Sequence, residues 1–192
     1  MTLHITLLAY TTTPFKQIGE KKTDYQTLYR EYVKLHHIDE EIDEFGGWEY
    51  IYLDEDDIPE LFISSGYPIT PAHILSVVNG RVVESSTSDG FSYIPRKGRI
   101  LAGRGMHMSQ NNAYLQSFKN GKNTNLYTFL LDYSNRDGDG YDEDEPEHHI
   151  DEKKTDITTF EKFLNDKYFK LGKYIKAGSD GNNLLPMEEL WQ

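Results

Sequence analysis

The chain has 192 residues, of which 37% are hydrophobic and 13% aromatic, with 14 tyrosines and no cysteine. This length and apolar content are enough for one continuous core, so we expect a single folded domain rather than a disordered chain. The lack of cysteine excludes a disulfide framework, thiolate metal sites and cysteine nucleophiles, but it does not fix a compartment.

The net charge of −12 is concentrated in two short segments. Residues 39–60 contain eleven carboxylates and no lysine or arginine, and residues 135–152 contain nine carboxylates and only Arg136. The rest of the chain therefore carries 19 basic and 12 acidic residues. Two concentrated negative patches would repel a phosphate backbone, which argues against nucleic-acid binding as the main role.

Residues 1–20 begin with a short apolar run, which predicts a first strand from Thr2 to Tyr10. The basic residues that normally precede the apolar part of a secretory signal are missing, so an unusual or truncated export leader is the alternative. No stretch of the sequence has the length of apolar residues that is needed to span a bilayer.

Residues 23–45 are predicted to form an amphipathic helix that covers a sheet. Apolar residues recur with helical spacing between Tyr25 and Ile38, which places them on one face. Thr23, with Gln26 three residues later, has the pattern of a capping box at the helix start.

Residues 48–133 are predicted to form an antiparallel meander of about eight strands, arranged as a sandwich or a partly curled sheet. Asn79-Gly80 and Asn120-Gly121 each separate two strand-like runs, and this dipeptide favours the type I′ turn of a hairpin. Arg96-Lys97-Gly98 predicts a third tight connection. Connections this short indicate antiparallel pairing, because parallel strands need longer crossovers.

Residues 134–156 are predicted to form an acidic loop, and residues 157–178 a second amphipathic helix that begins with a capping box of Thr158 and Glu161. Residues 179–192 would then be a tail with one short turn of helix. The predicted fold class is α+β, an antiparallel β-meander with an amphipathic helix before and after it.

The first candidate cation site is the run DEDDIPEL, in which Asp54, Asp56 and Glu60 alternate with other residues. Carboxylates placed close together repel each other, and a hard cation such as Ca²⁺ offsets that repulsion. A solvated acidic turn, whose side chains accept hydrogen bonds from the backbone, is the alternative.

The stretch YIYLDEDDIPELFIS, with NGRVVESS and the FKNGK hairpin behind it, resembles a group of largely uncharacterised proteins of Gram-positive gut bacteria, which are often exported or lipid-anchored. Their segment reads like D-I-D-G-D-G-I-P-E-L, which is similar to the calcium loops of integrin-type propeller repeats. The resemblance implies Asp54, Asp56 and Glu60 as ligands. Tyr52 stands where those loops have their first Asp, and Asp57 where they have Gly.

The second candidate cation site is the run NRDGDGYDE. Asn135, Asp137 and Asp139 have the spacing of the first ligands of a calcium loop, Tyr141 would offer its backbone carbonyl, and Glu143 would bind directly or through water. A surface loop rich in Asp and Gly is the alternative.

Other chemistry has weaker support. His148-His149 have no spaced His or Cys partner, so we expect solvent-exposed histidines at the end of a polar loop rather than metal ligands. The sequence contains no G-x-S-x-G, phosphate-binding glycine loop or H-E-x-x-H motif, which makes an enzyme the weakest class.

These patterns predict a monomeric, non-enzymatic binding or interaction module, stabilised by Ca²⁺, in a bacterial surface or secreted protein. The alternative is an acidic, intracellular (cytoplasmic) inhibitor or immunity-type protein that binds a basic protein partner through charge complementarity. A third interpretation is that the acidity only keeps a tyrosine-rich sheet soluble.

Overall fold

The computed structural model describes residues 24–67, 70–107, 110–133, 146–178 and 183–192. In these ranges the chain forms two α-helices, three short 3-10 helices and eleven strands. In chain order the elements are α1 (Tyr25–Leu35), η1 (Ile38–Glu41), β1 (Gly47–Ile51), β2 (Glu60–Ser64), β3 (Ala72–Val78), β4 (Arg81–Thr87), β5 (Gly90–Ile94), β6 (Arg99–His107), β7 (Gln110–Lys119), β8 (Lys122–Asp132), β9 (Glu147–Ile150), β10 (Lys153–Thr155), α2 (Ile157–Lys167), η2 (Phe169–Leu171), β11 (Ile175–Gly178) and η3 (Met187–Trp191).

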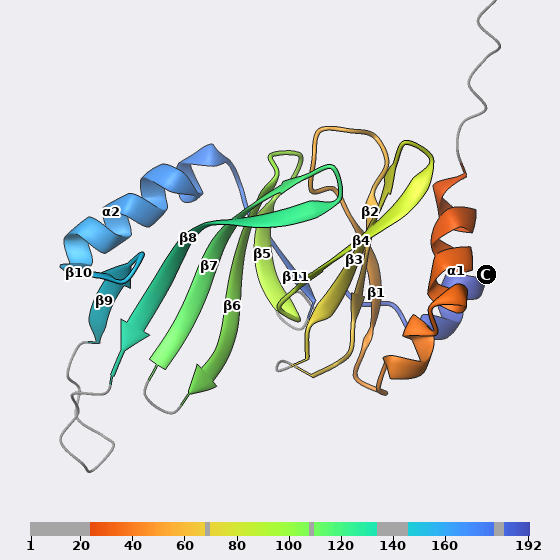
Figure 1. Ribbon diagram of the computed structural model, residues 1–192, viewed down its shortest axis with the longest axis horizontal. Coiled ribbons are helices and arrows are strands. Elements are labelled where there is room, and N and C mark those ends of the chain that lie inside the picture. The colour runs from red at the N-terminus through yellow and green to blue at the C-terminus, as the bar shows by residue number, and fades with distance from the viewer. Residues whose placement is uncertain (1–23, 68–69, 108–109, 134–145, 179–182) are drawn as a thin grey trace, which may run out of the picture.

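The strands form two antiparallel sheets that pack against each other, with a helix on the outer face of each (Figure 1). The four-stranded sheet has the order β1-β2-β3-β4, and the seven-stranded sheet has the order β10-β9-β8-β7-β6-β5-β11. The fold class is therefore α+β with antiparallel meander connections, as predicted, and neither sheet closes into a barrel. The predicted first strand, Thr2 to Tyr10, lies outside the described residues.

The main core lies between the two sheets. Phe62 of β2 meets Phe91 of β5 with ring centroids 5.2 Å apart, and Phe118 of β7 is buried in the same cluster. The β7–β8 hairpin also reaches over the four-stranded sheet, where the side-chain amide of Asn123 donates to the carbonyl of Ser86 at 3.0 Å. This contact fixes the hairpin whose tip forms part of the site described below.

Each helix buries its apolar side against the outer face of a sheet. Tyr29 and Val33 of α1 are fully buried over the four-stranded sheet, and the Tyr29 hydroxyl donates to the carbonyl of Pro59 at 2.8 Å. In α2, Phe160 and Phe163 pack on Phe129 of β8 with ring centroids 5.6 and 6.1 Å apart.

The three predicted tight connections are present. Asn79 and Gly80 have φ of 52° and 74°, and Asn120 and Gly121 have φ of 51° and 70°, values that Asn and Gly tolerate better than other residues. They connect β3 with β4 and β7 with β8. Residues 95–98 connect β5 with β6.

The prediction of one helix from residue 23 to 45 is wrong in extent. α1 ends at Leu35, and His37 has a φ of 57°, which the right-handed helix does not accommodate. Asp24 caps the helix, because its side chain accepts from the backbone N–H of Thr27 at 3.2 Å. Thr23 lies outside the described residues.

The prediction of a second helix from residue 157 to 178 is correct only for its first half. α2 ends at Lys167, and Ile175–Gly178 form strand β11 instead. Pairing with β5 satisfies the backbone of this segment and completes one edge of the seven-stranded sheet. The helix begins at Asp156, which accepts from the N–H of Thr159 at 2.9 Å, and not at a Thr158–Glu161 box.

The prediction that residues 134–156 form only a loop is also wrong, because β9 and β10 pair within this range. Residues 134–145 lie outside the described residues. His148 and His149 belong to strand β9 and are partly buried rather than exposed. The His148 ring lies 5.0 Å from that of Phe160 on α2.

The chain end returns to the four-stranded sheet. Leu185 exchanges two backbone hydrogen bonds with Trp48, at 2.8 and 3.0 Å, along the outer edge of β1. The following η3 is the short helical turn predicted for the tail, and its Leu190 is buried beside α1.

Candidate functional site

The acidic loop, defined here as Asp54–Asp57, connects β1 to β2 at one end of the four-stranded sheet. In this hairpin Ile51 pairs with Glu60 next to the loop, whereas Gly47 pairs with Ser64 at the far end. Residues 39–44 lie near that far end, where the N–H of Asp43 donates to the carbonyl of Ser65 at 3.2 Å. The acidic segment 39–60 is therefore not one patch, because its carboxylates are divided between two ends of a sheet.

The acidic loop is held by its own short side chains. The N–H of Asp56 donates to a carboxylate oxygen of Asp54 at 3.1 Å, and the N–H of Ile58 donates to Asp56 at 2.8 Å. Side chains of Asp accept such bonds two residues on, which fixes the turn without glycine. Asp57 does not have a positive φ, so this position does not require glycine.

Arg96 connects the acidic loop to the β5–β6 turn. Its guanidinium donates to the carbonyl of Asp56 at 2.7 Å and to the carboxylate of Asp57 at 3.2 Å, and it lies 4.7 Å from the centroid of the Tyr52 ring. The backbone N–H groups of Arg96 and Gly98 donate to the carbonyls of Tyr52 and Leu53 at 2.9 and 2.7 Å. The two connections therefore form one rigid unit.

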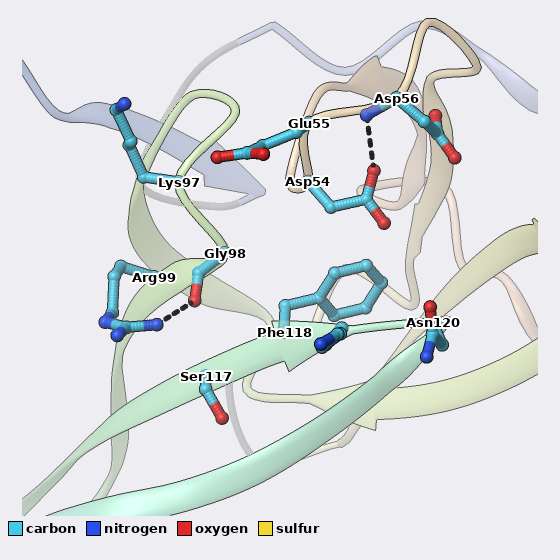
Figure 2. Close-up of a pocket in the computed structure, with 10 residues that line it drawn as sticks. Asp54, Glu55, Asp56, Lys97, Gly98, Arg99, Ser117, Phe118 and Asn120 are labelled. Carbon is cyan, nitrogen blue, oxygen red and sulfur yellow. Dashed lines mark hydrogen bonds between the residues drawn. The ribbon is translucent and has the colours of Figure 1, made fainter.

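A cleft of about 500 Å³ opens beside this unit (Figure 2). One wall carries three acidic residues of the loop, and the other walls come from the β5–β6 turn and the β7–β8 hairpin. The lining residues are Asp54, Glu55, Asp56, Lys97, Gly98, Arg99, Ser117, Phe118, Lys119 and Asn120. Figure 2 shows the Phe118 ring below Asp54, between the loop and the hairpin.

The cleft has opposite charges on its walls. Lys97, Arg99 and Lys119 face the acidic loop across it, yet none of these three cations forms an ion pair within the described part of the chain. Asp54, Glu55 and Asp56 form none there either. Charged side chains that line a cleft without forming ion pairs across it can contact a ligand.

Glu60, the third predicted ligand of the first calcium site, does not point into the cleft. Its side chain is 2% exposed and accepts from the backbone N–H of Leu53 at 2.8 Å. Burial raises the pKa of Glu60 to about 8, although the bond from Leu53 lowers it. A second buried carboxylate, Glu49, accepts from the N–H of Gly178 at 2.9 Å, and burial raises its pKa too.

The structure thus separates the predicted ligands of the first loop. Asp54 and Asp56 lie on the surface and Glu60 lies inside, and among the described residues no three His, Cys, Asp or Glu side chains gather in a group that would hold a metal ion. The residues of the second predicted site, Asn135 to Glu143, lie outside the described ranges.

Sequence reasoning missed the basic walls of the cleft. The sequence does contain a basic region that could have indicated them, because residues 90–131 contain six lysines and arginines and no carboxylate. That run includes Lys97, Arg99 and Lys119, but their approach to the acidic loop depends on packing between segments about 40 to 65 residues apart, which no local pattern reveals.

Comparisons with protein-family models, with curated proteins and with solved structures found no match for this chain. None of the helices in the described residues is both long enough and apolar enough to cross a membrane.

Proposed function

We propose that the protein is a non-enzymatic binding module whose contact site is the cleft and the acidic loop beside it, and that its partner is a protein with a basic segment. The observation that carries this proposal is the set of charged side chains that line the cleft and form no ion pair within the described residues. Cationic side chains of the partner would meet Asp54, Glu55 and Asp56, while the ammonium groups of Lys97 and Lys119 would donate to carbonyl or carboxylate groups of the same segment.

We infer that the two buried carboxylates, Glu60 and Glu49, have a structural role and do not act as a general acid or base. A general acid with a raised pKa has to reach the substrate, but Glu60 and Glu49 are sealed inside and bonded to backbone N–H groups. The charged side chains that line the cleft are others, those of the acidic loop and of Lys97, Arg99 and Lys119, and they are placed to contact a partner.

A test selects peptides from a random library on the full chain and measures the affinity of the best binder by calorimetry. The triple variant Asp54→Asn, Glu55→Gln, Asp56→Asn keeps the side-chain oxygens that hold the loop but removes the three negative charges that line the cleft. We expect basic peptides and a loss of affinity of at least tenfold in this variant, with a strong dependence on salt.

A matched control removes the same number of charges elsewhere. The variant Asp39→Asn, Glu40→Gln, Glu44→Gln changes the net charge equally, at residues around η1 near the other end of the sheet. Its affinity should stay within about twofold of the wild type. Equal losses in both variants would mean that diffuse charge attracts the peptide and that the cleft is not the site.

The proposal includes Ca²⁺ binding at the second candidate cation site, residues 135–143. Ca²⁺ held by Asn135, Asp137, Asp139, Tyr141 and Glu143 would offset part of the charge there and stabilise the segment. If the protein binds Ca²⁺, we propose that it is secreted or lies on the cell surface. If it binds no metal, we propose that it is an intracellular inhibitor. The response to Ca²⁺ described below separates them.

A further inference from the structure

A second surface, of opposite character to the acidic loop, follows the end of α2. Residues 169–176, here called the FKLGKYIK segment, are all exposed, in a run of eight. Four of them are large and apolar, with exposed fractions of 42% for Phe169, 41% for Leu171, 44% for Tyr174 and 40% for Ile175. Isolated apolar side chains on a surface are ordinary, but a group that gathers on one face marks an interaction site. The rings of Phe169 and Tyr174 contact each other in this way. Ile175 lies on the face of β11 that also carries Ala177.

Ring contacts hold two of the apolar side chains, Phe169 and Tyr174, in place. The Phe169 and Tyr174 rings lie 5.7 Å apart, and both contact the ring of Tyr168, at 5.3 and 6.4 Å. Tyr168 is fully buried, and its hydroxyl donates to Ser92 of β5 at 3.1 Å. Pairing of Ile175 with Tyr93 then ties the far end of the segment to the same strand.

The segment is also basic within an acidic protein. From residue 166 to 178 there are four lysines and one aspartate, a net charge of +3. Lys170 pairs with Asp166 at 2.5 Å, and Lys167 lies 6.0 Å from the Tyr127 ring. Lys173 and Lys176 form no ion pair within the described residues.

This composition points to a lipid surface more than to a protein partner. Lysine is depleted from the cores of protein–protein interfaces, where arginine is preferred, and every cation from residue 166 to 178 is lysine. At a bilayer surface, aromatic and aliphatic side chains enter the boundary of the acyl chains, while lysines extend along them to the anionic headgroups. The alternation of apolar residues with lysines in FKLGKYIK allows both contacts at once.

We propose that the FKLGKYIK segment docks the protein on the surface of a bilayer that contains anionic lipid. The segment runs from the end of α2 through η2 to the edge strand β11, which anchors its far end to the seven-stranded sheet (Figure 1). Carboxylates that lie more than about 8 to 10 Å from the bilayer are largely screened from it at physiological salt. Docking therefore needs only the local charge to be positive.

The test is sedimentation of the full chain with vesicles of phosphatidylcholine alone and of phosphatidylcholine mixed with phosphatidylglycerol. We expect binding to the mixed vesicles that weakens with salt, and little to the neutral ones. The variant Lys173→Gln, Lys176→Gln should lower the partition coefficient roughly 30-fold, because each lysine near an anionic surface contributes about a factor of five. Phe169→Ala with Leu171→Ala should lower it as well.

The control variant Lys34→Gln, Lys122→Gln removes the same charge from α1 and β8, and it should bind like the wild type. All variants are compared by circular dichroism and melting temperature, so that unfolding is not mistaken for lost docking. Absence of wild-type binding to the mixed vesicles, or equal losses in the two lysine variants, would overturn the proposal. Capture of a polyglutamate peptide without vesicle binding would assign the segment to an acidic protein instead.

Discussion

The side chain of Glu60, which was predicted to bind a cation, stabilises the fold by accepting a backbone hydrogen bond. It occupies the position that the motif assigns to a ligand, but the first residue of β2 points into the core between the sheets. There it accepts the N–H of Leu53, which would otherwise lack a partner next to the acidic loop. The cost of burying the group appears as its raised pKa.

This raised pKa predicts a pH dependence of stability. Between pH 4.5 and about 8 the folded chain keeps a proton on Glu60 that the unfolded chain has lost, so the free energy of unfolding falls as pH rises through this window. The fall has an upper limit on the order of 5 kcal/mol. The variant Glu60→Gln keeps the acceptor oxygen without the charge. Urea unfolding of this variant should show a clearly flatter dependence between pH 5 and 8 than the wild type, and identical slopes would contradict this assignment.

The second acidic run gives a separate prediction about single residues. If Asp137 and Asp139 bind Ca²⁺, millimolar Ca²⁺ raises the melting temperature and a chelator reverses the rise, since a ligand that binds only the folded state stabilises it. The variant Asp137→Asn, Asp139→Asn should lose the shift, and Mg²⁺ serves as the control cation. A wild-type melting curve that does not change with Ca²⁺ would remove calcium from the proposal and favour the metal-free alternative.

At the scale of the elements, the hairpins were the most predictable part of the fold. Asn-Gly pairs fix the β3–β4 and β7–β8 turns locally, and β1 to β8 fill the range in which about eight strands were expected. Strands β9, β10 and β11 were missed because they are three or four residues long. Their own sequences are too short to show a strand pattern, and pairing with a neighbouring strand stabilises them instead. For example, β11 pairs with β5, which lies more than 80 residues earlier.

The two hairpins differ in what surrounds their glycines, and this predicts unequal effects of alanine. Both Gly80 and Gly121 have positive φ, so alanine strains either turn by about 1 kcal/mol. A Cβ at Gly80 would meet open space, whereas one at Gly121 would lie 3.0 Å from Val83 and 3.2 Å from Ser76. Denaturant unfolding should therefore show the larger loss of stability for Gly121→Ala. Equal losses would contradict the close contact of the β7–β8 hairpin with the four-stranded sheet.

At the scale of the whole molecule, charge is arranged by the packing of distant segments. The acidic segment 39–60 was evident in the sequence, and the position of its acidic loop in a connection between two strands was predicted correctly. Its division between two ends of a sheet and its approach to Lys97 and Lys119 follow from strand register and from the β7–β8 hairpin reaching across. Sequence periodicity reports which face of one element is apolar, but not which side chains of two elements meet.

We thus propose two surfaces that bind different partners. One is the charged cleft at the acidic loop, and the other is the apolar, basic segment after α2. If both proposals hold, the first binds a basic protein while the second rests on an anionic bilayer. Variants of one surface should then leave the other unaffected, because the two sets of residues do not overlap.

The central claim is that the cleft is the contact site. The most direct measurement is amide chemical-shift mapping of the ¹⁵N-labelled full chain during titration with the basic peptide selected on it. We expect the largest shifts at Asp54–Asp57, at Lys97–Arg99 and at Ser117–Asn120, three segments that meet only in the folded cleft. Shifts spread over all acidic residues, or concentrated around η1, would contradict it.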